Sequence, residues 1–83
     1  MPLLVNALFF ASYKDVVGTG RLSVELTEGA TVADLIESLR ARGAPYDRLP
    51  AEPAVAVNRA YASFDEPLGP DDEVAFIPPV AGG

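Results

Sequence analysis

Gly82 and Gly83 close the printed chain, and folding alone gives no reason for a glycine pair at this position. A terminal glycine has no side chain to bury and the largest backbone freedom to lose, so the pair stabilises nothing. Because these residues lack Cβ atoms, the terminus is thin enough to thread a narrow channel. We therefore predict a reactive α-carboxylate on Gly83 that enters the active site of another protein, with Gly82 providing clearance.

A carboxylate is a poor electrophile, so the terminus must be activated before a nucleophile attacks it. ATP bound by a second protein would convert the carboxylate of Gly83 to an acyl-adenylate, and a sulfur donor would then leave a thiocarboxylate. The chain needs no thiol of its own for this chemistry, which agrees with its lack of cysteine. The alternative is that the glycine pair is a frayed end or a cleavage remnant.

The residues before the glycines predict an extended arm. Pro78 and Pro79 follow an apolar segment, and proline has no N–H to donate to a β-ladder. The six residues from position 78 to position 83 would reach roughly 19 to 22 Å at about 3.1 to 3.6 Å each. We therefore divide the chain into a folded domain at residues 1–77 and a C-terminal tail at residues 78–83.

Composition excludes most other catalytic chemistry. The chain has no Cys and no His, so it offers no thiolate, no imidazole base and no Cys or His metal site. Acidic pairs at positions 65–66 and 71–72 lie in turn-forming sequence, where the burial needed to shift a pKa for acid–base catalysis is rare. We expect no metal, and we interpret Asp72 and Glu73, next to Asp71, as a cluster that steers a basic partner.

Net charge limits the classes of partner. Six Lys and Arg residues against twelve Asp and Glu residues give a net charge of −6, which repels nucleic acids and anionic membrane surfaces. The apolar runs at 3–5 and 7–11 are too short to cross a bilayer, and no basic segment precedes them as in a signal peptide. The 83 residues therefore suggest one small cytoplasmic domain without nucleic-acid or membrane partners.

Strands are indicated by composition and by alternation. Residues 3–10 are rich in Leu, Val and Phe, and the polar residues 12–15 follow them before the break at 18–20. Residues 21–26 alternate polar and apolar side chains, as a half-buried strand does. Further short strands are predicted at 54–58, 60–62 and 73–77, with a turn at Asn58 and Arg59.

A single amphipathic helix is predicted after the second strand. Thr31 is placed as its N-cap, because its hydroxyl can accept from the amide of Asp34. Gly43 is expected to provide the left-handed stop. The apolar stripe recurs at helical spacing, and its members are Val32, Leu35, Ile36 and Leu39.

The order strand, strand, helix, short strands predicts an α+β domain. We expect a small mixed sheet with one main helix packed across one face, which is the order of a β-grasp, or ubiquitin-like, fold. The proline-rich residues 44–53 are predicted to be a surface loop, and residues 65–72 to be turns.

Both faces of the first and last strands are apolar. In residues 3–10 and 73–77, apolar side chains occupy consecutive positions, whereas one helix can cover only one face of a sheet. The other face is therefore predicted to be an apolar interaction surface. The alternative is that residues 44–53 fold back and cover this face.

The sequence from position 72 to position 83, ending in Pro-Pro-Val-Ala-Gly-Gly, closely resembles the MoaD-like sulfur carriers, the small subunits of molybdopterin synthase. Residues 9–11, 29–35 and 57–58 are also similar to that family, so the resemblance spans nearly the whole chain. The chain departs from the family pattern at Asp71, where the family commonly has glycine, and in the proline-rich loop at 44–53.

The resemblance implies a β-grasp fold without a bound cofactor, and it implies a sulfur-donating subunit whose main active site is on another chain. A MoeB-like enzyme would use ATP to adenylate Gly83, and a sulfur donor protein would complete the thiocarboxylate. The tail would insert into a MoaE-like large subunit of a heterotetramer and give sulfur to cyclic pyranopterin monophosphate. The expected partner-binding residues are Phe76, Pro78, Pro79, Val80, Ala81, Asp72 and Glu73.

Two other interpretations of the same features remain open. The chain could be a ubiquitin-like carrier or modifier of another pathway, such as thiazole synthesis, tRNA thiolation or lysine conjugation. The Pro-Pro-Val segment argues against the thiazole carriers. Alternatively, the chain could be an interaction module whose glycine pair is inert.

Overall fold

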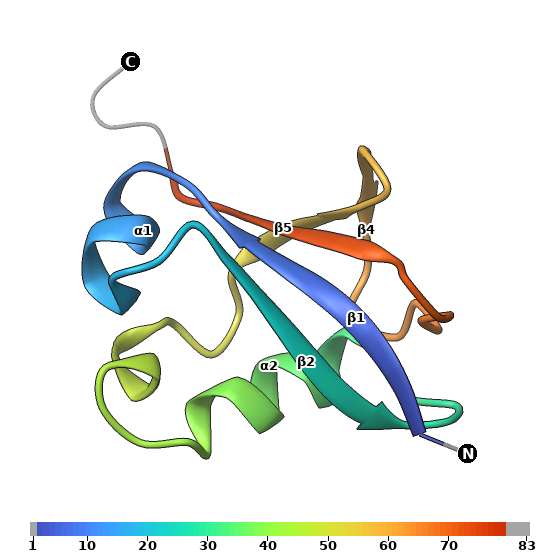
Figure 1. Cartoon of the computed structure of the whole chain (residues 1–83). Helices are drawn as coiled ribbons and strands as arrows, with labels where there is room; N and C mark the ends of the chain where they lie inside the picture. Colours follow the sequence, from blue (N-terminus) through green and yellow to red (C-terminus); the bar gives the residue numbers. More distant parts are fainter. Residues whose placement is uncertain (1, 80–83) are drawn as a thin grey trace.

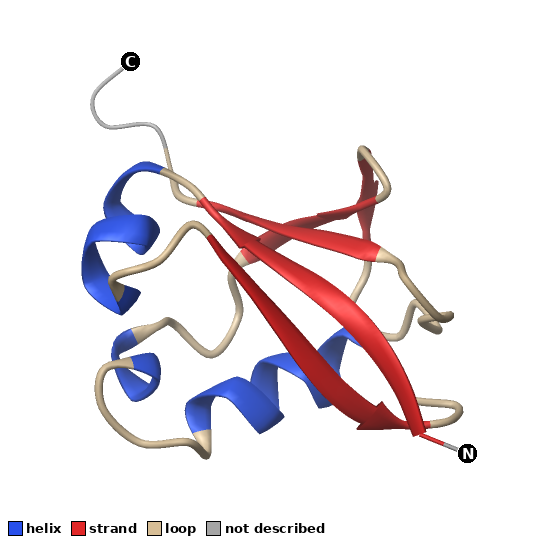
Figure 2. Ribbon diagram, in the orientation of Figure 1, coloured by secondary structure: helices blue, strands red, loops and turns tan. Residues whose placement is uncertain are grey.

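A computed structural model describes residues 2–79 of the chain. These residues form a five-stranded sheet with helices gathered on one of its faces (Figures 1 and 2). The elements in chain order are β1 (Pro2–Phe9), α1 (Ala11–Val17), β2 (Arg21–Thr27), α2 (Val32–Arg40), the short 3-10 helix η1 (Tyr46–Arg48), β3 (Ala54–Val57), β4 (Ala60–Ala62) and β5 (Glu73–Ile77).

The sheet is mixed, and its strand order is β2-β1-β5-β3-β4. β1 pairs antiparallel with β2 and parallel with β5, while β5 pairs antiparallel with β3. β5 is thus the middle strand, held on both sides. The prediction of an α+β domain with a small mixed sheet and one main helix is confirmed, as are all five strands.

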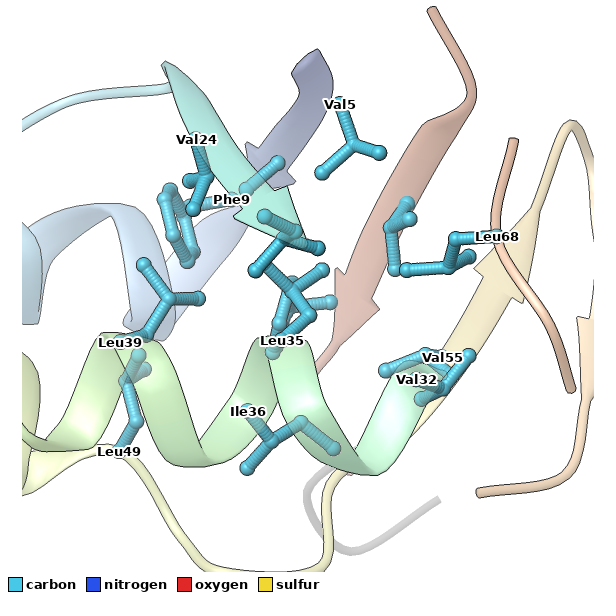
Figure 3. Packing of buried hydrophobic residues seen from close by; sticks show 14 of the residues in the cluster. Val5, Phe9, Val24, Val32, Leu35, Ile36, Leu39, Leu49, Val55 and Leu68 are labelled. Carbon is cyan, nitrogen blue, oxygen red and sulfur yellow. The ribbon is translucent and has the colours of Figure 1, made fainter. Parts of the chain in front are cut away.

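Alternation along β1 divides its side chains between two environments. Val5, Ala7 and Phe9 are buried on the face that carries α2, whereas Leu4 on the opposite face is 53% exposed. Side chains from α2 and from the sheet meet between the two layers (Figure 3). The Phe9 ring lies 5.2 Å from the Phe76 ring, centroid to centroid, so β1 and β5 also meet in the core.

Local sequence determines where α2 begins. The amide of Asp34 donates to Thr31 Oγ1 at 3.3 Å, and the amide of Thr31 donates to Asp34 Oδ2 at 2.9 Å. This reciprocal pair satisfies two amides that the first turn of a helix leaves without partners. The predicted N-cap is therefore confirmed. α2 itself ends at Arg40, and Gly43 adopts a left-handed φ of 83° just beyond it.

The helix α1 was not predicted. It has only seven residues, and no side chain caps its first turn. It is held by tertiary contacts, because Tyr13 and Val17 are buried in the core, and by Gly18, whose left-handed φ of 81° ends it. Its sequence is too short and too weakly periodic to indicate a helix.

The proline-rich residues 44–53 pack on the helix side of the sheet. Leu49 is buried in the core, and its carbonyl accepts a hydrogen bond from Arg40 Nε at 3.0 Å. The Tyr46 ring lies 6.4 Å from the Phe9 ring. The alternative that this loop covers the whole opposite face of the sheet is therefore wrong, because Tyr46 and Leu49 pack on the helix side, while Leu4 and Tyr61 stay exposed.

We predict that Thr31→Ala lowers the free energy of unfolding by about 1 kcal/mol, because it removes the acceptor for the Asp34 amide. Denaturant unfolding followed by circular dichroism measures this change. Thr31→Ser keeps the hydroxyl and is the matched control, expected to stay close to the unsubstituted chain. Equal losses in the two variants would contradict the capping role.

Candidate functional site

The predicted tail begins at the end of the middle strand of the sheet. β5 ends at Ile77, and Pro78 and Pro79 follow at once, as expected from residues that cannot continue a ladder. Val80, Ala81, Gly82 and Gly83 lie outside the described residues, so their roles stay predictions. What the structure shows is the base of the tail, which is anchored to a strand paired on both sides.

A groove of about 550 Å³ lies at this base. It brings together residues from α1, the 44–53 loop, β4 and the end of β5. Tyr61, on one wall, is 79% exposed. The lining residues are Tyr13, Pro50, Glu52, Pro53, Ala54, Tyr61, Ile77, Pro78 and Pro79. Two residues of the predicted site, Pro78 and Pro79, therefore line a concave surface with aromatic and aliphatic neighbours.

The face of the sheet opposite α2 is apolar near this groove. Leu8 is paired with Ala75, and Ile77 is paired with Ala54, so these side chains share that face. Phe10, at the end of β1, is 50% exposed. We call Leu8, Phe10, Tyr61, Ala75 and Ile77 the outer face. The helices lie on the other side of the sheet (Figure 2), so the expected exposed apolar surface is present among the described residues.

Phe76 differs from the expectation. Its side chain is fully buried and faces the core, because it alternates with Ala75 and Ile77 along β5. It contacts Phe9 and is therefore a core residue that holds β5 in place. Any contact of this strand with a partner would be made by Ala75 and Ile77 instead.

Asp72 is held by hydrogen bonds within the chain. Its Oδ1 accepts from Asn58 Nδ2 at 2.9 Å, and its Oδ2 accepts from the amide of Gly69 at 2.7 Å. The carboxylate thus braces the turn before β5 against the turn between β3 and β4. This role was missed, because it depends on a contact between residues far apart in the sequence.

Glu73 is tied to the same turn. Its amide donates to Asn58 Oδ1 at 3.0 Å, and its carbonyl accepts from the amide of Asn58 at 2.8 Å. Asn58 and Arg59 both have positive φ, 49° and 75°, which confirms the predicted tight turn. The predicted docking role of Asp72 and Glu73 is not tested by these contacts.

Asp71 adopts a left-handed backbone with φ of 65°. Its amide donates to the carbonyl of Leu4 at 2.7 Å, which fixes the turn against β1. Glycine enters this region without steric cost, whereas a residue with a Cβ atom does not. The departure from glycine noted in the sequence therefore falls at a position where the backbone conformation favours glycine.

Residues 2–79 contain neither a metal-binding cluster nor a membrane-spanning helix. No group of three or more acidic, Cys or His side chains is arranged to hold a metal ion in this part of the chain. Among the same residues, none of the helices has the length and apolar character that crossing a membrane requires.

Comparison with known proteins bears on this geometry. The model of the ThiS family matches residues 7–83, which includes the outer face, the groove and the whole tail. The chain belongs to the ThiS family. Within this family, it is 42% identical to the molybdopterin synthase sulfur carrier subunit of Escherichia coli, covering 96% of this chain and all of that protein. The corresponding protein of Mycobacterium tuberculosis is 39% identical, covering 95% of this chain and 96% of that one.

Solved structures of similar proteins agree. A putative molybdopterin converting factor subunit 1 from Pyrococcus furiosus superposes with a TM-score of 0.82 at 34% identity, covering 94% of this chain and 99% of that one. SAMP1 from Haloferax volcanii superposes with a TM-score of 0.83 at 26% identity, and the match covers 96% of this chain and 99% of SAMP1. The predicted β-grasp fold and the resemblance to MoaD-like sulfur carriers are confirmed for this ThiS-family chain.

We predict that Asp71→Gly raises the free energy of unfolding and that Asp71→Ala lowers it, each by about 0.5 to 1 kcal/mol, because only glycine relieves the left-handed backbone. Both variants remove the same carboxylate, so each controls for the loss of charge in the other. Urea unfolding measures the difference. A change of the same sign in both variants would mean that the carboxylate, and not the backbone, decides the stability.

Proposed function

We propose that this chain is the sulfur carrier subunit of a molybdopterin synthase and that Gly83 carries the transferred sulfur. The observation that carries this proposal is the full-length match to curated proteins of that name, together with a family match that extends to residue 83. Similarity over the folded part alone would support the fold, whereas similarity through the glycine pair also supports the chemistry of the terminus.

The proposed loading reaction has two steps. The carboxylate of Gly83 attacks the α-phosphorus of ATP and forms an acyl-adenylate, with pyrophosphate as the leaving group. A hydrosulfide ion released by a donor protein then attacks the acyl carbon and displaces AMP, which leaves a thiocarboxylate. ATP would be bound by a MoeB-like activating enzyme, so the carrier supplies only the acyl group.

In the proposed transfer, the loaded tail enters a MoaE-like large subunit that holds cyclic pyranopterin monophosphate. Each transfer moves one sulfur to the pterin and returns the terminus to a carboxylate, with water supplying the oxygen. A dithiolene contains two sulfur atoms, so its completion takes two loaded carriers. We propose an assembly of two small and two large subunits, in which the large subunit supplies most of the pterin site.

The outer face and the groove are suited to hold such partners. A small domain without a resident active site needs a docking surface beside its reactive terminus, and exposed apolar side chains beside Pro78 and Pro79 provide one. A protein–protein complex of subunits 1 and 2 of the molybdopterin-converting factor from Helicobacter pylori has been solved. One chain of that complex superposes on this chain with a TM-score of 0.69 at 20% identity. We propose that the activating enzyme and the large subunit use this same face in turn.

The loading reaction is tested by mass spectrometry of the intact chain. After incubation with a MoeB-like enzyme, ATP and a sulfur donor, we expect the mass increase that corresponds to replacing one oxygen by sulfur at the terminus. The control lacks Gly83 and is expected to fold normally but to stay unmodified, because the tail contributes little to the core. An unchanged mass, under conditions that load a known carrier, would contradict the proposal and favour an inert interaction module.

The docking surface is tested by truncating exposed aromatic side chains. Tyr61→Ala is expected to weaken binding to the large subunit by about tenfold or more, because aromatic anchors carry much of the energy of an interface. Phe64→Ala is the matched control, since Phe64 is 38% exposed but lines a different groove, beside α2. Isothermal titration calorimetry measures both, and equal effects would place the interface elsewhere.

A role as a protein modifier is the second candidate. The observation that favours it is the similarity to SAMP1, a small archaeal modifier protein, at a TM-score of 0.83. The two roles share the adenylated terminus and differ in the acceptor, which is a pterin for the carrier and a lysine amine for the modifier. Lysine-linked adducts that end at Gly83, detected in cell extracts by peptide mass spectrometry, would favour the modifier.

A further inference from the structure

The strand β2 forms one edge of the sheet. It pairs with β1 over its whole length, and it is the terminal strand in the order β2-β1-β5-β3-β4 (Figure 1). An edge strand carries a row of backbone donors and acceptors that can bind another extended chain.

The register of the ladder identifies the outward groups. Phe9 and Gly20 form a hydrogen-bonded pair, with the Phe9 amide 3.0 Å from the Gly20 carbonyl oxygen. Hydrogen-bonded and non-hydrogen-bonded pairs alternate in an antiparallel ladder. The residues of β2 whose backbone groups face away from β1 are therefore Arg21, Ser23, Glu25 and Thr27.

Two of these four residues already use outward groups. Thr19 Oγ1 donates to the Arg21 carbonyl at 3.0 Å and lies 3.4 Å from the Arg21 amide. The Thr27 carbonyl accepts from the Ala30 amide at 3.0 Å. Within residues 2–79, the outward N–H and C=O groups of Ser23 and Glu25 have no protein partner. Their spacing of two residues is the repeat of a β-ladder.

A groove of about 460 Å³ begins beside Glu25 and continues along the C-terminal end of β2, between this strand and α2. Leu26 and Thr27 line it on the strand side, and Asp34 and Ser38 line it on the helix side. A strand added to β2 would place alternate side chains in this groove, on the same face of the sheet as Leu26. Its other side chains would lie on the outer side, beside the exposed Glu25.

Charge selects the kind of chain that fits. Glu25 and Asp34 border the groove, and the chain as a whole carries a net charge of −6. A basic side chain opposite Glu25 would form a cross-strand ion pair, whereas an acidic one would be repelled. Small or apolar side chains suit the positions that face the groove, beside Leu26 and Ser38.

We propose that the edge of β2 binds an extended segment of a partner protein in which basic and apolar residues alternate. The segment adds a sixth strand through backbone hydrogen bonds to Ser23 and Glu25. Its basic side chains lie beside Glu25, and its apolar side chains lie in the groove between β2 and α2. This surface is separate from the groove beside Pro78 and Pro79, since Glu25 pairs with Leu4 near the start of β1, whereas Phe76 near the end of β5 pairs with Phe9 at the other end of β1.

An edge strand can also pair with the same strand of a second copy of the chain. Two copies would bring together two chains of net charge −6, and Arg21 is the one basic side chain that the β2 strand of a second copy would offer to Glu25. Exposed charges of this kind are a common protection of edge strands against self-pairing. The acidic border therefore favours a basic partner over self-association.

The test uses the full chain and a six-residue peptide of alternating lysine and valine, acetylated and amidated at its ends. We expect saturable changes in the NMR resonances of the Ser23 and Glu25 amides, with slower hydrogen exchange of both. A peptide with glutamate in place of lysine controls for charge, and a lysine–valine peptide methylated on alternate backbone nitrogens controls for hydrogen bonding. Neither control peptide is expected to bind.

Charge reversal at the edge gives the matched pair of variants. Glu25→Lys is expected to weaken binding of the lysine–valine peptide by roughly fivefold at low salt. Glu37→Lys makes the same change of charge on α2, beside a different groove, and is expected to change the dissociation constant less than twofold. The proposal is overturned if the Ser23 and Glu25 amides do not respond, if the glutamate peptide binds equally well, or if the two variants weaken binding equally. If the free chain sediments as a dimer and its Ser23 and Glu25 amides are protected from hydrogen exchange, the edge of β2 binds a second copy of the chain instead.

Discussion

The parallel pairing of β1 with β5 is the constraint on which the rest of the structure depends. It joins residues 6–9 to residues 73–76, segments at nearly opposite ends of the chain, and it places β5 in the middle of the sheet. The contact between Phe9 and Phe76 secures this pair in the core. Because β5 has neighbours on both sides, Pro78 and Pro79, which follow it, start from a fixed point.

The same strands serve the core and the surface through simple alternation. Phe76 faces α2, whereas Ala75 and Ile77 face away from it. Coverage of only one face by the helices leaves the other face exposed in this part of the chain. A small domain can thus obtain a stable core and an exposed apolar surface from one strand, since the two faces use different side chains.

The sequence was informative where local rules decide the structure. Alternation located the strands, and the Thr31–Asp34 capping box located the start of α2. Residue contacts that depend on the folded chain could not be found in this way. α1 is stabilised by the burial of Tyr13 and Val17 and not by its own propensity. Asp72 looked like a surface acid, because its partner Asn58 is fourteen residues away in the sequence.

The direction of β1 relative to β5 also separates the two ends of the described chain. Phe9 lies beside Phe76, so Pro2 lies seven residues further along β1, at the opposite end of the sheet. At about 3.3 Å per residue, this separation is roughly 23 Å. An affinity tag, a fluorophore or a surface linkage attached before Pro2 would therefore sit well clear of Pro78 and Pro79, and would leave the carboxyl-terminal side of the protein open to large binding partners.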